Sequence, residues 1–339
     1  MKNGFRWAFI ICISLTSIIL GIVIGSVNIS LESIMGICGY KIFGMPLPET
    51  IPSINVSILW DIRMPQVIMA FLVGGSLAAS GTVMQSVLRN PLASSYTLGI
   101  SSGASLFAAL VIVTGFSIIG KYTLPTAGFI GGLITVFLAM MLTMHFDKNL
   151  ENQTIILVGM VLSLFVNGML TLITSLAKDH LARLIFWQMG SFTGQSWDNS
   201  FLLFVVFLLC IFLLVYYSRE MDLMTFGEEH AMSAGVELKT VKLILIAIAA
   251  LLTGTSVSMV GVIGFVDLIA PHVVRKFFGS NHRAVIPASA LMGGSLMVCA
   301  DLIGRTVIAP RQIPVGAVTA LVGAPFFAYV YFSRRRKVM

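Results

Sequence analysis

The feature that most constrains this chain is a succession of apolar segments, each about as long as a membrane is thick. A hydrocarbon core of about 30 Å requires about 20 residues of helix. Backbone groups inside lipid must be paired within the protein, which favours helices for segments of this length. By this criterion the sequence predicts ten spanning helices, at residues 7–28, 65–88, 97–118, 124–145, 154–177, 199–217, 241–260, 263–279, 284–304 and 313–332. The fold class expected is an all-α polytopic membrane protein with a single transmembrane domain over residues 1–339.

Composition supports this class and argues against a soluble protein. Only 10% of the 339 residues are charged and 57% are hydrophobic, whereas a soluble domain carries about 25% charged residues. The net charge of +7 is compatible with nucleic-acid binding, but basic residues at the cytoplasmic membrane face explain it better in a chain with a mean hydropathy of +0.97. We therefore expect membrane lipid around the chain and no nucleic-acid partner.

The basic residues also predict the topology. With the N-terminus in the cytoplasm, fourteen of the 21 Lys and Arg residues fall on the cytoplasmic side and seven on the other. This distribution satisfies the positive-inside rule. An even number of helices returns the basic tail Arg334–Lys337 to the same side, so both termini are predicted to be cytoplasmic.

The longest polar interruption, at about 219–242, carries eight of the chain's charged residues. Within it, Gly227 and Gly235 enclose the run EEHAMSA, which consists of good helix formers and starts with two acids. Negative charge favours a helix N-terminus and glycine favours a helix end. Two interpretations are open at this point: a short cytoplasmic helix that a soluble partner contacts, or a solvated connecting loop.

Residues that carry chemistry are scarce. The chain has no Gly-x-x-x-x-Gly-Lys-Ser/Thr sequence, so it cannot bind nucleotide phosphates in the P-loop manner. No Ser-His-Asp set, carboxylate pair or metal-ligand spacing is evident, which argues against a membrane enzyme. The residues indicate transport, and one possibility is an ion-gradient-driven secondary transporter that uses Asp267 and Asp301 as proton-coupling carboxylates.

Four stretches are more specific than composition. In chain order they are Arg63-Met-Pro-Gln66 continuing through Asn90-Pro91 to Leu106, the GEEHAMSAGV stretch at 227–236, Gly261–Arg275 with His282-Arg283 after it, and Ala300–Arg305 continuing into Ile313–Val330. Over residues 60–332 they resemble the membrane subunits of ABC importers for iron siderophores, haem and cobalamin, the FecCD-type permease family.

The resemblance implies a type II ABC importer permease with ten helices and no enzymatic activity or bound cofactor of its own. Its expected partners are a second permease subunit, identical or related, two cytoplasmic ATPase subunits that hold ATP and Mg²⁺, and an extracytoplasmic substrate-binding protein. The expected location is the bacterial cytoplasmic membrane. The expected substrate is a metal chelate, first a ferric siderophore, with haem and cobalamin as alternatives.

The resemblance also assigns candidate cytoplasmic residues. The GEEHAMSAGV stretch is similar to the family's coupling helices, and the candidates for ATPase contact are Glu228, Glu229, His230, Ala231, Ser233 and Gly235. Asn90 and Leu92 match a position of the family's cytoplasmic gate, and Asn152 and Gln153 match a second one. The alternative for the first pair is that Pro91 only ends a helix and Asn90 caps the next turn.

On the outer face the resemblance implies that arginines meet acidic residues of the binding protein. Arg63 and Arg305 stand at matching positions, and Arg311 is a substitute where Gln66 replaces the family's second arginine. The alternatives are a snorkelling helix-end residue for Arg63 and an intrahelical pair of Arg305 with an acid four residues earlier. Asp267 stands where glycine is commoner, and it is either a functional intramembrane acid or an acid in water at the outer interface.

Overall fold

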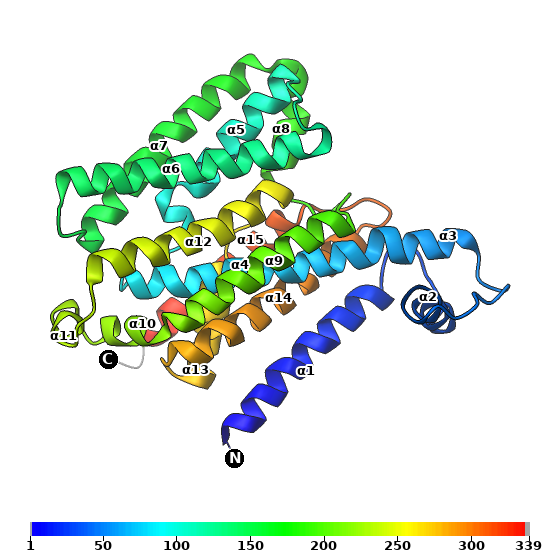
Figure 1. Ribbon diagram of the computed structural model, residues 1–339. Helices are drawn as coiled ribbons and strands as arrows, with labels where there is room; N and C mark the ends of the chain where they lie inside the picture. Colours follow the sequence, from blue (N-terminus) through cyan, green and yellow to red (C-terminus); the bar gives the residue numbers. More distant parts are fainter. Residues whose placement is uncertain (1, 336–339) are drawn as a thin grey trace.

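The computed structural model describes residues 2–335, which form helices joined by short connections (Figure 1). No strand occurs within this range, so the predicted all-α class is confirmed. Arg336 and Lys337 of the predicted basic tail lie outside the described residues.

The α-helices follow one another with short irregular or 3-10 connections. In chain order they are α1 (Lys2–Val23), α2 (Leu31–Phe43), α3 (Ser53–Val56), α4 (Met64–Val87), α5 (Ile100–Thr114), α6 (Thr123–Phe146), α7 (Asn152–Leu176), α8 (Leu181–Gln188), α9 (Trp197–Tyr216), α10 (Ser218–Thr225), α11 (Glu228–Ser233), α12 (Leu238–Val260), α13 (Val266–Phe278), α14 (His282–Thr306) and α15 (Val315–Arg335). A π-helical turn, Ser57–Arg63, joins α3 to α4.

Each of the ten predicted segments coincides with a helix, namely α1, α4, α5, α6, α7, α9, α12, α13, α14 or α15. Seven helical stretches in the described part of the chain are long and apolar enough to cross a membrane. α5 and most of α15 are shorter apolar helices, and α13 has only 13 residues. The count of ten crossings and the cytoplasmic position of both termini therefore stay predictions.

Two notable helices, α2 and α8, lie outside the ten predicted segments. In α2 the hydroxyl of Ser30 accepts a hydrogen bond from the backbone N–H of Ser33 at 3.2 Å, and Gly44 ends the helix in the left-handed conformation with φ of 68°. These are ordinary helix start and stop signals. At 13 and 8 residues, α2 and α8 are too short to meet a criterion based on membrane thickness.

α4 is the most enclosed helix, and nearly every residue from Pro65 to Val87 is buried. It packs against α14, α12, α13 and α9. Contact with α14 depends on glycine, because a Cβ on Gly74 would lie 2.8 Å from the carbonyl carbon of Gly293. α5 and α6 approach in the same way through Gly103 and Gly131. Small residues thus allow these helices to pack closely, as is common among membrane helices.

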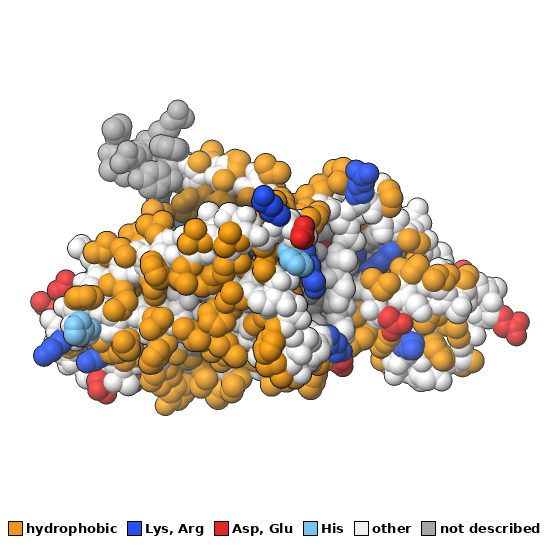
Figure 2. All heavy atoms as spheres, turned by 90° about the horizontal axis from the view of Figure 1, so that it is seen from above, with side chains coloured by type: hydrophobic (Ala, Val, Ile, Leu, Met, Phe, Trp, Pro, Cys, Tyr) orange, Lys and Arg blue, Asp and Glu red, His pale blue; other side chains and the backbone are white. Residues whose placement is uncertain are grey.

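The bundle has distinct ends. α10 and α11 lie at one end of it, and α2 and α3 lie at the opposite end (Figure 1). Figure 2 shows hydrophobic side chains spread over the face seen from above, with charged side chains gathered toward the ends and in one central group. On α7, for example, Leu164, Phe165 and Leu176 are 73%, 65% and 84% exposed. Such a surface is suited to lipid or to another apolar subunit.

Candidate functional site

α11 is a separate short helix because glycines define both of its ends. Gly227 has φ of 129° and ψ of 150°, and Gly235 has φ of 85°. Side-chain-bearing residues rarely adopt either conformation. The structure therefore shows a helix at Glu228–Ser233, where the sequence left open a helix or an irregular loop.

α11 is anchored on one side and exposed on the other. The side chain of Ala231 is fully buried and packs into the largest core cluster. Glu229, His230 and Ser233 are exposed, as is Gly235 just beyond the helix. The Ser233 hydroxyl donates a hydrogen bond to the carbonyl oxygen of Glu229 within the helix, at 2.9 Å. The outer face of the helix thus carries polar side chains together with the exposed Met232.

The remaining candidate of this stretch, Glu228, forms an ion pair with a buried lysine. Lys242, in the second turn of α12, has a side chain that is only 1% exposed. Its Nζ lies 2.8 Å from Oε1 of Glu228, 2.9 Å from the carbonyl oxygen of Leu150 and 3.0 Å from Oδ1 of Asn152. Three N–H donors therefore meet three acceptors, which come from α11, from the turn between α6 and α7, and from the start of α7.

A second buried connection ties α10 to the bundle. Nδ1 of His282, at the start of α14, lies 2.6 Å from Oδ1 of Asp222 on α10, and Nε2 lies 2.5 Å from Oγ of Ser86 near the end of α4. No Ser-His-Asp set is evident in the sequence, but the fold brings Ser86, His282 and Asp222 within hydrogen-bond distance. Ser86 is 6% exposed and also bonds the carbonyl oxygen of Thr82 inside its own helix. The arrangement therefore holds helices together.

The candidate gate residues occupy two different settings. Oδ1 of Asn90 accepts a hydrogen bond from the backbone N–H of Leu92 at 2.9 Å, so this pair forms a local turn after α4. The side chain of Leu92 is 48% exposed. Asn152 is bonded to Lys242, and Gln153 beside it is exposed. Of these four residues, Asn152 is thus connected to α11, through Lys242.

The three candidate docking arginines differ in exposure. Arg63 is 4% exposed, and its guanidinium donates to the carbonyl oxygens of Ile22, Val23 and Val27 at 3.0, 3.2 and 2.6 Å, where α1 ends. Arg305 is also 4% exposed. Arg311, in the connection between α14 and α15, is exposed. In this arrangement Arg311 alone of the three offers its side chain to a partner without movement of α1.

Arg305 belongs to a buried polar cluster with two other residues. Its Nε lies 3.3 Å from Oδ2 of Asp301, one turn earlier on α14, and its Nη2 donates to the carbonyl oxygen of Gly21 at 2.5 Å. Oδ1 of Asp301 accepts a hydrogen bond from Gln66 at 2.7 Å. Gln66 stands at the position where the resemblance leads us to expect an arginine, and here its amide donates a hydrogen bond to a buried carboxylate. The intrahelical pair is therefore present.

Asp267 lies in the first turn of α13 and is 1% exposed. The hydroxyl of Ser94 donates a hydrogen bond to its carboxylate. Gln85 donates to its backbone carbonyl at 3.3 Å, and Gly81 of α4 packs directly against its backbone. In this structure the acid is buried between α13, α4 and the segment after α4, and not in water at a surface.

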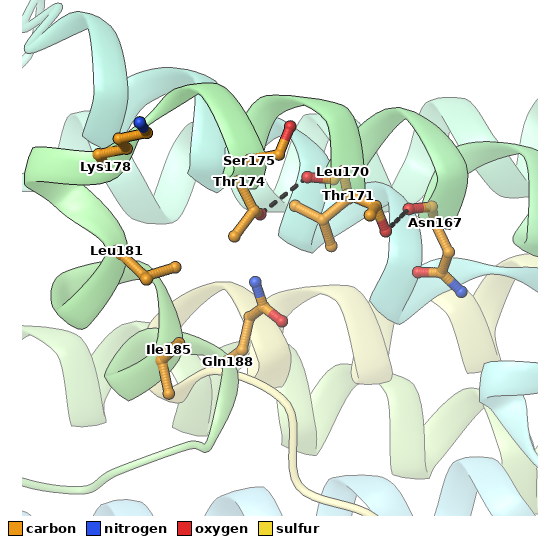
Figure 3. Close-up of a pocket in the computed structure, with 9 residues that line it drawn as sticks. All are labelled: Asn167, Leu170, Thr171, Thr174, Ser175, Lys178, Leu181, Ile185 and Gln188. Carbon is orange, nitrogen blue, oxygen red and sulfur yellow. Dashed lines mark hydrogen bonds between the residues drawn. The ribbon is translucent and has the colours of Figure 1, made fainter.

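An open cleft of about 610 Å³ lies between α7 and α8 (Figure 3). Polar side chains line much of it, and in Figure 3 the Gln188 amide and the Thr174 side chain point toward the same space. A neighbouring hollow of about 210 Å³ shares Asn167, Leu170 and Gln188 with it and adds three serines from α5. Most of the residues that line the two hollows carry hydroxyl or amide groups, with one lysine, Lys178, and no acid among them, although apolar atoms contribute most of the surface of the larger cleft.

The sequence predicts no role for Lys242, and it places His282 only in one of the stretches that carry the family resemblance. A signal for Lys242 was present, since it falls two residues inside the predicted span 241–260 and a lysine in that setting needs a partner. Its acceptors at Leu150 and Asn152 are about 90 positions away in the chain. The contact therefore cannot be read from a single sequence.

Comparisons with known proteins agree on one family. A sequence model of the FecCD transport family matches residues 12–333. An uncharacterised ABC transporter permease protein of Bacillus subtilis is 36% identical in an alignment 340 residues long that covers 99% of this chain and 96% of that protein. The hemin transport system permease protein of Yersinia pestis is 35% identical over 284 residues, 82% of this chain and 84% of that protein. A solved inward-facing ABC transporter, assigned to the metal-chelate type, superposes with a TM-score of 0.82 at 28% identity and covers 96% of this chain and 99% of its own.

Proposed function

Because the chain belongs to the FecCD transport family, we propose that it is the permease subunit through which an ABC importer takes up a ferric siderophore. The fold is that of a type II ABC importer permease, and the chain is a transport component, not an enzyme. Family membership also removes the alternative of an ion-gradient-driven secondary transporter. In this proposal the protein lies in the bacterial cytoplasmic membrane and pairs with a second permease subunit.

α11 is the observation that carries the proposal. It is a six-residue helix with one buried anchor, Ala231, and an exposed polar face at one end of an apolar bundle. A short rigid helix of this kind fits a groove on a separate ATPase subunit, and closure of two such subunits around ATP and Mg²⁺ would displace it as a rigid body. We assign ATPase contact to the exposed residues Glu229, His230 and Ser233.

The cleft between α7 and α8 supports the choice of substrate. Pockets for flat apolar ligands are usually lined by hydrophobic and aromatic side chains, and no aromatic residue lines this cleft. Most of its lining residues carry hydroxyl or amide groups, one lysine adds positive charge, and no carboxylate is among them. Such a lining suits a chelate that carries many oxygen acceptors, as iron chelates of hydroxamates, catecholates and hydroxycarboxylates do, and the lysine suits the negative charge of the last two classes. Haem and cobalamin remain the alternatives for the same family.

On the opposite end of the bundle we assign Arg311 as the first contact for an extracytoplasmic binding protein, because its side chain is exposed. Arg63 and Arg305 can contact a binding protein only if α1 moves away from them, because both donate to carbonyl oxygens in or just after α1. An exposed charge contributes mainly to the rate of encounter. Asn90 with Leu92, and Asn152 with Gln153, are proposed as the cytoplasmic gates, which two copies would close by steric contact.

Uptake into proteoliposomes tests the proposal. The permease would be reconstituted with candidate ATPase subunits and binding proteins from its own genome, and uptake of ⁵⁵Fe-siderophore, ⁵⁵Fe-haem and ⁵⁷Co-cobalamin would be measured with ATP and with a non-hydrolysable analogue. We expect ATP-dependent uptake of the siderophore and none of the others. Preferential uptake of haem or cobalamin would overturn the substrate, and absence of ATP-dependent uptake of every chelate would overturn the proposal.

A further inference from the structure

Lys242 is a buried lysine at a position of α12 where helix packing does not call for a charged side chain. The side chain is 1% exposed, and Val241 and Leu245 of the same helix belong to the hydrophobic core. A buried ammonium loses its hydration, and apolar residues of similar volume in place of a whole buried ion pair often give equal or higher stability. Helix packing alone therefore does not account for a lysine here. What lysine adds is three directed donors.

Each of the three donors binds a different part of the cytoplasmic end. Glu228 is the first residue of α11, Leu150 closes the turn between α6 and α7, and Asn152 is the first residue of α7. These acceptors lie 2.8 to 3.0 Å from Nζ, within the range of strong charge-assisted hydrogen bonds. One atom thus bridges three segments that are not continuous in sequence.

The turn before α7 is itself held in a fixed shape. The carboxylate of Asp147 accepts hydrogen bonds from the backbone N–H groups of Asn149 and Glu151, at 2.9 and 2.6 Å. Leu150 adopts φ of 55°, in the left-handed region that few non-glycine residues enter. The Leu150 side chain is fully buried, and its carbonyl oxygen meets Nζ of Lys242. A fixed turn can transmit displacement, whereas a loose one would absorb it.

We propose that Lys242 is a positioning residue that makes α11 and the start of α7 move as one body. Displacement of α11 by an ATPase would then reach Asn152 and Gln153 without passing through the length of α12. This inference rests on the proposed function, because it takes α11 as the ATPase contact. Lys242 itself touches neither ATPase nor substrate, and it acts through the segments that it joins.

The first test separates transport from ATP hydrolysis in the reconstituted complex. Lys242→Met removes all three donors and keeps an unbranched side chain, while the exposed face of α11 and its anchor Ala231 are unchanged. We expect the variant to bind the ATPase and to hydrolyse ATP, but to move roughly tenfold less substrate per ATP, within the usual range of coupling between sites. Lys148→Met is the matched control, since Lys148 is an exposed lysine in the same turn, and we expect it to match the parent.

A second measurement reports the motion directly and does not depend on substrate. Spin labels at Asn149→Cys and Ala234→Cys, both exposed positions, would be placed in a background that lacks the exposed Cys12 and Cys299. In the parent complex we expect a single narrow distance distribution that is the same with and without ATP. With Lys242→Met, or with Lys242→Gln if the former does not fold, we expect the distribution to broaden or shift when ATP binds.

The outcomes distinguish this inference from the function on which it rests. A parent chain that transports with the expected ATP dependence, combined with an unchanged ratio of transport to hydrolysis and an unchanged label distance in the Lys242 variants, would overturn the role of Lys242 alone. A parent chain that binds no ATPase would overturn both. Equal losses of assembly, hydrolysis and transport in Lys242→Met would show a merely structural residue and also overturn the proposal.

Discussion

The buried cluster around Asp301 provides a quantitative test of how this bundle is held together. Asp301 and Arg305 are 3% and 4% exposed at the side chain, and their closest atoms are 3.3 Å apart. In Asp301→Asn the amide oxygen can still accept from Gln66, so one hydrogen bond is kept while the negative charge is lost. The Arg305 guanidinium is then left as an uncompensated buried charge.

Breaking a buried pair in this way costs about 3–5 kcal/mol. Because the bond from Gln66 and the bond from Arg305 to the carbonyl oxygen of Gly21 both persist, we expect a loss near the lower limit, about 3 kcal/mol. The free energy of unfolding would be measured by SDS titration in mixed micelles, with fluorescence of the four tryptophans as the signal.

An exposed pair supplies the matched control. Lys121 and Asp198 lie 3.2 Å apart with side chains that are 64% and 68% exposed. Water screens such a pair, so we expect Lys121→Met to leave the free energy of unfolding almost unchanged. A loss in Asp301→Asn no greater than that in Lys121→Met would refute the argument, because it would mean that Arg305 finds solvent when its partner is removed.

Two further predictions concern packing and pH. Gly103→Leu should prevent α5 from packing on α6, because the added Cβ would lie 2.8 Å from Cβ of Thr135. We expect aggregated protein in size-exclusion chromatography, whereas Gly168→Leu, which meets open space, should stay monodisperse. The backbone N–H groups of Glu151 and Asn149 hold the pKa of Asp147 below its usual 3.8. A lowered pKa means that the charged carboxylate stabilises the fold above about pH 4 and that this contribution is lost as the pH falls through the lowered value. The melting temperatures of the parent and Asp147→Asn should therefore differ at pH 7 and converge toward pH 3, and a constant difference would contradict the assignment.

Much of the fold follows from the sequence because lipid leaves few choices. Runs of about 20 apolar residues have to form helices, and all ten predicted segments contain one. Short helices escape this reasoning. α8 is eight residues long and forms one wall of the polar cleft, but nothing in its length distinguishes it from an external loop.

The candidate sites could be predicted from the sequence only in part. Gly227 and Gly235 enclose α11 as the sequence indicates. The burial of Arg63 could not be predicted, because it depends on where the carbonyl oxygens at the end of α1 lie. Connections such as the one made by Lys242 join residues about 90 positions apart. Side-chain contacts of this kind are set by tertiary packing and not by local pattern.

Capture of an ATPase is the measurement that tests the central claim most directly. The chain would be co-expressed with candidate ATPase subunits from its own genome and purified in detergent. ATP turnover would then be measured with the empty and the loaded binding protein. The account predicts a stable complex with one ATPase per permease and a turnover that rises with the loaded binding protein. A chain that purifies alone, or a turnover that ignores the binding protein, would contradict it.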